Sequence, residues 1–121
     1  MSRILVVDDS RVTQHMLKLL LRRNKYDVTV AGDGVAGLNA LSAEAIDLVI
    51  ADINMPELDG LGMVAAMRED DRYAELPVLM LTATSDDGHQ DRAAHLGVKG
   101  FITQPFDSQQ LIATVQSLVP A

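Results

Sequence analysis

Five short runs of mainly apolar residues are spaced along the chain. They cover residues 4–7, 28–31, 47–51, 78–81 and 100–103. Each run is bounded by turn-forming or charged residues, and continuous apolar runs of this length are typical of strands that are buried on both faces. We therefore predict five strands over these ranges.

Between the strands, apolar residues recur every three or four positions, which is typical of amphipathic helices. The first predicted helix is capped by Asp9 or Ser10 and closes at 24–25. The second is capped by Asp33 and extends through 41. The third predicted helix begins at Asp59 and Gly60. The apolar positions of these three helices are Val12, Met16, Leu19 and Leu20 with the stem of Arg23, then Leu38 and Leu41, then Leu61, Val64 and Met67.

The pattern of the fourth helix is the weakest of the five. Its apolar content is mostly Ala93, Ala94 and Leu96, it follows a polar loop over 84–88, and Gly97 is expected to end it. Asp107 or Ser108 is expected to cap the last helix. The buried side of that helix is predicted to consist of Leu111, Ile112, Val115, Leu118 and Val119.

Strands and helices that alternate in this way require right-handed crossovers and a parallel sheet with helices on both faces. The fold class is therefore α/β, with a doubly wound, five-stranded parallel sheet and five helices. The order of the strands cannot be read from periodicity. With no internal repeat or linker, residues 1–121 are expected to form one domain.

Composition narrows the classes of function. Ten basic and 17 acidic residues give a formal net charge of −7, which disfavours direct binding of nucleic acid. No apolar run approaches the length of a membrane helix, so no membrane insertion is expected. The N-terminus leads directly into a strand, so we expect no signal peptide. The absence of cysteine fits a cytoplasmic protein.

Polar residues directly follow four of the predicted strands. Asp8 and Asp9 follow the first, Asp52 the third, Thr82 the fourth and Gln104 the fifth. In an open α/β sheet the functional site lies at the carboxyl ends of the strands. Carboxylates that meet there repel one another, and a hard divalent cation such as Mg²⁺ removes that repulsion. A carboxylate beside the ion can act as a nucleophile toward a phosphoryl group, and Thr82 could donate its hydroxyl to a phosphoryl oxygen.

Four segments taken together resemble the receiver domains of two-component response regulators, including single-domain chemotaxis regulators. The resemblance covers essentially the whole chain and implies a flavodoxin-like sheet with strand order 2-1-3-4-5. The segments that carry it are residues 6–10 (VVDDS), 52–60 (DINMPELDG), 81–83 (LTA) and 101–106 (FITQPF).

The resemblance implies a role for each strand-end residue. Asp52 corresponds to the aspartate that accepts a phosphoryl group from a sensor histidine kinase or phosphotransfer protein. Thr82 corresponds to the switch hydroxyl. Phe101 corresponds to the switch aromatic, although a phenylalanine there could equally be core. The residues implied for the Mg²⁺ site are Asp8, Asp9, Asp52 and the backbone carbonyl of Asn54.

The same resemblance extends to partners and to turnover of the phosphoryl group. Asn54 and Thr84 occupy positions that tune its hydrolysis. A downstream protein target is expected on the face made by the fourth helix, the fifth strand and the fifth helix, and a homodimer is compatible with the family. The domain is expected to be a signalling module rather than an enzyme.

One position departs from the family pattern. Gln104 stands where the family has a lysine before the proline, and Lys99 lies too early in the chain to replace it. Glutamine keeps an amide donor but loses a positive charge beside the acids. This substitution supports an alternative, in which the domain is an interaction module that works without phosphorylation.

An enzyme on a similar sheet is the third class of function. A flavin protein needs a phosphate-binding loop after the first strand, where this chain has Asp8 and Asp9. A phosphatase with an aspartyl nucleophile needs a second acid two residues after it, where this chain has Asn54. His15, His89 and His95 are too scattered for a metal triad. The sequence therefore favours the two signalling interpretations over an enzyme.

Overall fold

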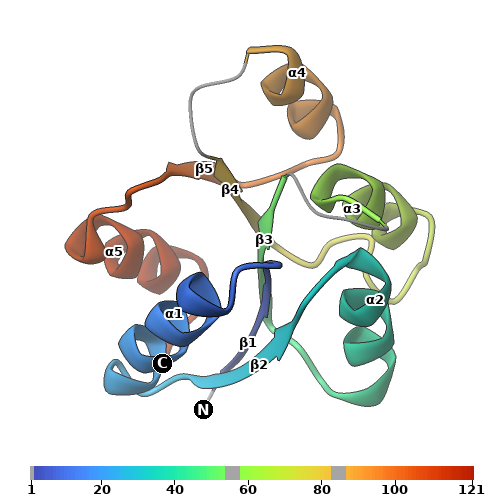
Figure 1. Ribbon diagram of the computed structural model, residues 1–121. Coiled ribbons are helices and arrows are strands. Elements are labelled where there is room, and N and C mark those ends of the chain that lie inside the picture. Colours follow the sequence, from blue (N-terminus) through green and yellow to red (C-terminus); the bar gives the residue numbers. More distant parts are fainter. Residues whose placement is uncertain (1, 54–57, 83–86) are drawn as a thin grey trace.

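The computed structural model describes residues 2–53, 58–82 and 87–121. Strands and helices alternate through these ranges (Figure 1). In chain order they are β1 (Arg3–Val7), α1 (Arg11–Arg23), β2 (Asp27–Ala31), α2 (Gly34–Ala43), β3 (Leu48–Asp52), α3 (Gly60–Arg68), β4 (Val78–Thr82), α4 (Asp87–His95), β5 (Gly100–Thr103) and α5 (Ser108–Leu118).

All neighbouring strands of the sheet are parallel, and their order is β2-β1-β3-β4-β5. The predicted fold class and the strand order implied by the resemblance are therefore confirmed. β1 and β3 lie side by side in the register Val7↔Ala51, so that both strands end at the same edge of the sheet. This register places residues 8, 9 and 52 near one another.

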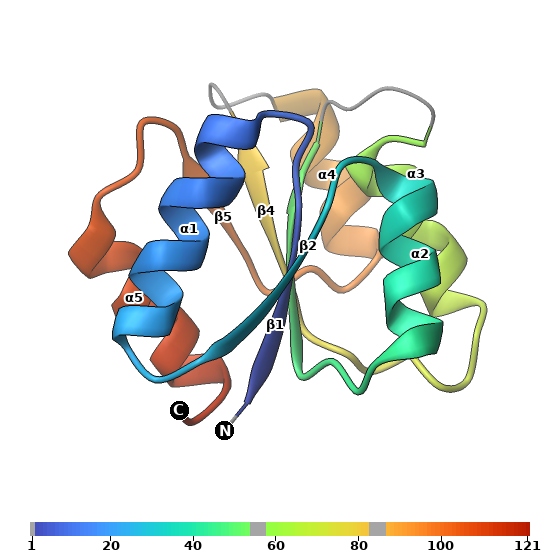
Figure 2. The ribbon, with the colours of Figure 1, turned by 60° about the horizontal axis from the view of Figure 1, so that its bottom comes forward.

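The sheet is covered on both faces (Figure 2). Alternate residues of each strand point to opposite faces, so the apolar core has two halves. Ile4, Val6 and Ile50 face α1 and α5, whereas Leu5, Val7 and Val49 face α2, α3 and α4. The central strands are apolar throughout because they are buried on both sides.

The buried face of α1 differs from the predicted one. Leu17 and Leu21 are completely buried, whereas Val12, Met16 and Leu19 are exposed by 69%, 51% and 53%. Leucines occupy positions 17, 19, 20 and 21, so two adjacent stripes of this helix have helical spacing. The core takes the stripe that faces the sheet. The apolar stripe named from the sequence therefore faces solvent, apart from Leu20, which packs against the core.

Side-chain caps settle two of the alternatives left open by the sequence. Ser10, rather than Asp9, accepts a hydrogen bond from the Thr13 N–H and begins α1. Asp107, rather than Ser108, accepts from the amides of residues 109 and 110 at the start of α5. Asp33 caps α2 as predicted. Asp59, which was predicted to begin the third helix, caps α3.

Element boundaries differ from the predicted ones by one or two residues. β3 runs one residue further than predicted and includes Asp52, and α4 already begins at Asp87, inside the range predicted as loop. Gly97, which follows α4, has a φ of +74°, a left-handed conformation that suits a glycine at a helix end. None of the helices in the described ranges is long and apolar enough to cross a bilayer.

Candidate functional site

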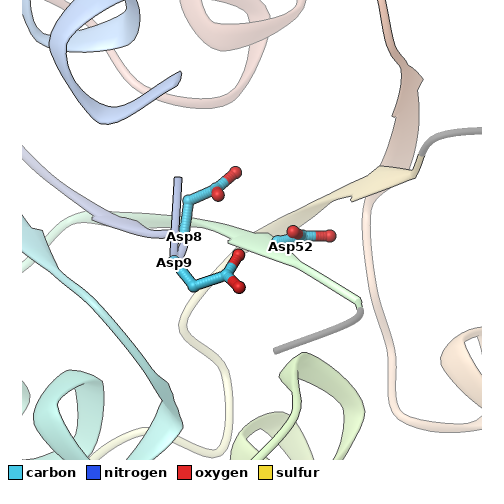
Figure 3. A group of neighbouring side chains, drawn as sticks. All are labelled: Asp8, Asp9 and Asp52. Carbon is cyan, nitrogen blue, oxygen red and sulfur yellow. The ribbon is translucent and has the colours of Figure 1, made fainter. Parts of the chain in front are cut away.

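Three carboxylates meet at the carboxyl edge of the sheet. Asp8 and Asp9 follow β1, Asp52 ends β3, and one oxygen of each lies within 4.8 Å of the others. Figure 3 shows the three side chains at the neighbouring ends of these two strands. The structure therefore brings together the three acidic side chains that the sequence predicted at this edge.

The three carboxylates differ in burial. Asp8 is 1% exposed, Asp52 is half-buried and Asp9 is exposed. The Oδ1 of Asp8 accepts a hydrogen bond of 2.8 Å from the Ser10 N–H. The Oδ2 of Asp8 is buried and has no hydrogen-bond partner among the described residues. Buried polar atoms normally have a partner, so this oxygen is a candidate metal ligand.

Burial raises the pKa of the Asp8 carboxyl, because a charged carboxylate is poorly solvated there. The Ser10 N–H opposes this effect, since it stabilises the charged form and lowers the pKa. The negative charge of Asp9 raises the pKa further. The negatively charged form of Asp8 is therefore electrostatically disfavoured, and a nearby cation would stabilise it.

A residue that the sequence analysis did not single out holds the Asp8 backbone. The Nε2 of Gln14 donates to the Asp8 carbonyl oxygen at 2.5 Å and, more weakly, to the Ala31 carbonyl oxygen at 3.4 Å. The Asp8 N–H in turn donates to the same Ala31 carbonyl at 3.0 Å. These bonds fix the segment after β1 between α1 and β2. The sequence offers one signal for this contact: Gln14 lies one turn after the cap of the predicted helix, close to the strand end at Asp8.

Asp52 is held by the start of α3. The Ile53 N–H donates to the Leu81 carbonyl, and the Gly60 N–H donates to the Ile53 carbonyl, each at 3.1 Å. A Cβ added at Gly60 would overlap the Asp52 carbonyl oxygen. The helix can therefore approach the end of β3 only because residue 60 has no side chain.

Two further predicted residues lie at the neighbouring strand ends. Thr82 is buried, 5% exposed, and ends β4. Its carbonyl oxygen accepts a 2.7 Å hydrogen bond from the Gln104 N–H, which ties the segment after β5 to β4. Gln104 is half-buried and lines a groove of about 210 Å³ with Thr13, Met16 and Phe106.

Phe101 lies in β5, and Lys99 directly precedes this strand. Phe101 is partly buried and packs against the core on the α3 side of the sheet, a position compatible with a core residue and with a switch. The backbone N–H of Lys99 donates to the Val78 carbonyl at the start of β4. Lys99 thus lies at the amino end of the sheet, away from the acids. Asn54 and Thr84 lie outside the described residues.

The donor set fits a divalent cation with oxygen ligands. At an effective dielectric near 20, two carboxylate charges 4.8 Å apart repel by roughly 3 kcal/mol. Bound Mg²⁺ reverses that repulsion, prefers carboxylate oxygens and keeps several waters. The buried, unpartnered Oδ2 of Asp8 supplies one such ligand. The three side chains could hold such an ion together.

Comparison with protein families gives a match over nearly the whole chain. The family model described as the response regulator receiver domain matches residues 4–116. The chemotaxis protein CheY of Pseudomonas aeruginosa is 35% identical over 117 residues, which cover 96% of this chain and 94% of that protein. The chain spans only 49% of another relative, the transcriptional regulator RpaA of Synechocystis, at 33% identity over 98% of this chain.

Solved structures agree with the family match. The chemotaxis protein CheY4 of Vibrio cholerae superposes with a TM-score of 0.93 at 31% identity, covering 98% of this chain and 99% of that one. The receiver domain of the sensor histidine kinase PA1611 from Pseudomonas aeruginosa gives a TM-score of 0.89 at 25% identity, covering 99% and 98% of the two chains. That structure is described as having a magnesium ion coordinated in its active site cleft.

Proposed function

This chain belongs to the response regulator receiver domain family, and from that premise we propose that Asp52 is its phosphoacceptor. Receiver domains are two-component signalling modules that interact with histidine kinases or phosphotransfer proteins and with downstream targets. The observation that carries the proposal is the meeting of Asp8, Asp9 and Asp52 at one edge of the sheet, with carboxylate oxygens within 4.8 Å of one another.

The reaction is an in-line transfer to a carboxylate oxygen. The Oδ of Asp52 attacks the phosphorus of a phosphohistidine, the P–N bond breaks, and the leaving imidazole nitrogen takes a proton. The product is an acyl phosphate on Asp52. Of the three acids, Asp52 suits this role because it is half-buried at the end of β3, whereas Asp8 is enclosed.

Mg²⁺ is the proposed cofactor. Asp8, Asp9 and Asp52 would hold it, with the backbone carbonyl of Asn54 as a further ligand by resemblance. When bound, the ion supplies positive charge that offsets both the three carboxylates and the incoming phosphoryl oxygens. The Ser10 N–H keeps one oxygen of Asp8 occupied, so the other, buried oxygen is the one available to the metal.

Thr82 and Gln104 are proposed to contact the phosphoryl group. Thr82 ends β4, the neighbour of β3, and Gln104 follows β5, the next strand along the sheet. The bond between the Gln104 N–H and the Thr82 carbonyl links them. A hydroxyl and an amide can each donate a hydrogen bond to a phosphoryl oxygen. Neither carries a charge, so we expect weaker electrostatic stabilisation than a lysine at 104 would provide.

The face made by α4, β5 and α5 is the proposed output surface. β5 is the edge strand of the sheet, with α4 on one side and α5 on the other (Figure 1). Phe101 lies in β5 and packs into the core, so a change at Thr82 in the adjacent strand could reach this face. A homodimer, the cytoplasmic location and the domain boundary at 1–121 stay predictions.

Phosphorylation is tested by intact-mass measurement after incubation with acetyl phosphate and Mg²⁺. We expect a gain of one phosphoryl group in the parent and in Asp71→Ala, a matched control whose carboxylate is exposed in the turn after α3. Asp52→Ala should show no gain, and omission of Mg²⁺ should remove it from the parent. An unmodified parent, or a modified Asp52→Ala, contradicts the proposal.

Gln104 supports one alternative, an interaction module that does not depend on phosphorylation. The absence of a cation at 104 leaves the phosphoryl group without its strongest side-chain partner. The two functions separate in the variant Gln104→Lys. If phosphorylation governs the domain, this change should alter the lifetime of the acyl phosphate, measured as the decay of the added mass. An unchanged lifetime, together with partner binding that survives Asp52→Ala, would favour the alternative.

A further inference from the structure

A second cavity lies beside the acid cluster, on the side of α1 that faces the edge strand β2. It has a volume of about 470 Å³, which is within the usual range for pockets that hold small molecules. Arg11, His15 and Lys18 line it from α1, and Val30 and Gly32 line it from the end of β2. Apart from Asp9, the function proposed above uses none of the residues that line this cavity.

Three nitrogen-bearing side chains reach the cavity from one stripe of the helix. Arg11, His15 and Lys18 are spaced at i, i+4 and i+7, so they lie one above the other on the helix surface. None of the three forms an ion pair with any residue that the structure describes. Their N–H groups can therefore be donated to a ligand without breaking an existing salt bridge.

The charge of this region is opposite to that of the whole chain. Residues 10–26 contain five basic residues and no acidic one, in a chain with a net charge of −7. A cavity lined by a guanidinium, an ammonium and an imidazole favours a ligand with several oxygen acceptors and negative charge. An extended polyanion would meet the negative field of the remaining surface, whereas a small anion meets only the local one.

The remaining walls indicate the rest of the ligand. Val30 is 38% exposed and gives the cavity an apolar wall. A Cβ placed at Gly32 would meet no atom within 4 Å, so the cavity is open at this corner. A bare phosphate ion would leave most of the 470 Å³ unfilled. A small organic body on the phosphate would fill it and contact Val30.

We propose that the cavity of Arg11, His15 and Lys18 binds a small phosphate monoester. The phosphate lies against the three side chains, and the organic part lies against Val30. This site is separate from Asp52, and its occupation does not require phosphorylation.

Asp9 couples the cavity to the acid cluster. It is the one acidic residue in the described lining of the cavity, and it is also one of the three clustered carboxylates. A cation held by that cluster offsets the charge of Asp9, so it should strengthen binding of an anion next to it. By linkage, the anion should strengthen binding of the cation by the same factor. This coupling rests on the proposed magnesium site, whereas anion binding itself does not.

The test is a titration with glycerol 3-phosphate, followed by amide chemical shifts of the ¹⁵N-labelled protein. We expect saturable shifts in residues 11–18 and 30–32, none with glycerol, and tighter binding when Mg²⁺ is present. Lys18→Gln should weaken binding by about tenfold, because a charge-assisted hydrogen bond is lost. In buffer without Mg²⁺, Asp52→Ala should still bind, even if acetyl phosphate fails to modify the parent.

Arg23→Gln is the matched control. Arg23 lies on the same helix and its replacement removes the same charge, but it lines a different groove, with Leu19 and Phe106. We expect its affinity to stay within about twofold of the parent, as for a distant exposed charge. Equal weakening by Arg23→Gln and Lys18→Gln would mean unspecific attraction and would overturn the proposal. So would shifts confined to residues 8, 9, 52 and 82.

Discussion

Charged side chains are bonded differently at the two ends of the sheet. At the carboxyl end, the Oδ2 of Asp8 is buried and has no hydrogen-bond partner among the described residues, and Asp9 and Asp52 add like charges beside it. At the amino end, the guanidinium of Arg68 donates to three backbone carbonyls. Its Nε–H bonds Leu96 at 2.7 Å, and its Nη1 bonds Tyr73 and Leu76 at 2.8 and 2.9 Å.

The difference separates a structural charge from a functional one. Arg68 joins the end of α3 to the segments that lead into β4 and β5. Burial lowers the pKa of its guanidinium, while the charge of Glu75 raises it. Its Nε and Nη1 donors are already used by backbone carbonyls. At the other end, the Oδ2 of Asp8 is not used by any of the described residues, which costs stability but leaves that oxygen available to a metal.

Removing the partnered charge should have the largest effect. Arg68→Met keeps most of the side-chain volume but leaves three carbonyls without their donor. We expect a loss of about 2–4 kcal/mol in the free energy of unfolding, measured by urea denaturation. Arg92→Met, at an exposed position in α4, should change it by no more than about 0.5 kcal/mol. Equal effects of the two substitutions would remove the contrast between the ends.

Removing the unpartnered charge should act in the opposite direction. In Asp8→Asn the remaining side-chain oxygen can still accept from the Ser10 N–H, and the new amide can donate to the neighbouring carboxylates. Without Mg²⁺ we expect a gain of about 1–3 kcal/mol in stability. The stabilisation of the parent by Mg²⁺ should be absent in the variant. A less stable variant in metal-free buffer would show that the negative charge of Asp8 does not destabilise the folded protein.

The pH dependence of stability is a second test of whether the charge of Asp8 destabilises the folded protein. Burial raises the pKa of Asp8 in the folded protein above its ordinary value of 3.8, so the folded state binds this proton more tightly than the unfolded chain does. Lowering the pH from the folded-state pKa to 3.8 should therefore add stability in the parent. In metal-free buffer, the advantage of Asp8→Asn should shrink over that window. A difference between parent and variant that is constant with pH would contradict this sign.

The smallest effect is expected for a neutral group at the amino end. The Tyr26 hydroxyl is buried, and it donates to the Val119 carbonyl at 2.7 Å. Tyr26→Phe removes this one bond and should cost about 1 kcal/mol, measured by the same denaturation. A loss as large as that of Arg68→Met would mean that charge is not what distinguishes these two donors.

The convergence of the acids was predictable from two things together, the parallel strands and their order in the sheet. Asp8 and Asp52 follow apolar runs, and adjacent parallel strands end at one edge of the sheet. The strand order that makes β1 and β3 neighbours came from the resemblance, since apolar periodicity carries no information on it. The caps of α2 and α3 were also predictable, because Asp33 and Asp59 precede helical patterns directly.

The contacts that could not be predicted connect side chains to distant backbone. Arg68 bonds carbonyls of residues 73, 76 and 96, and Gln14 bonds the Asp8 carbonyl. Each bond depends on where a turn or strand end comes to lie, which local patterns do not encode. The face of α1 was misassigned for a different reason. Its leucines form two apolar stripes, and only the position of the sheet decides between Leu17 and Leu19.

The first and last described segments of the chain are joined directly. The Ser2 hydroxyl donates to the Pro120 carbonyl at 2.5 Å, and both ends lie close together in Figures 1 and 2. A short loop could therefore connect them covalently, and new ends could be opened at the exposed turn that contains Asp71. Such a circular permutant would leave the carboxyl edge of the sheet untouched, so that the same architecture could be assembled from a rearranged order of its elements.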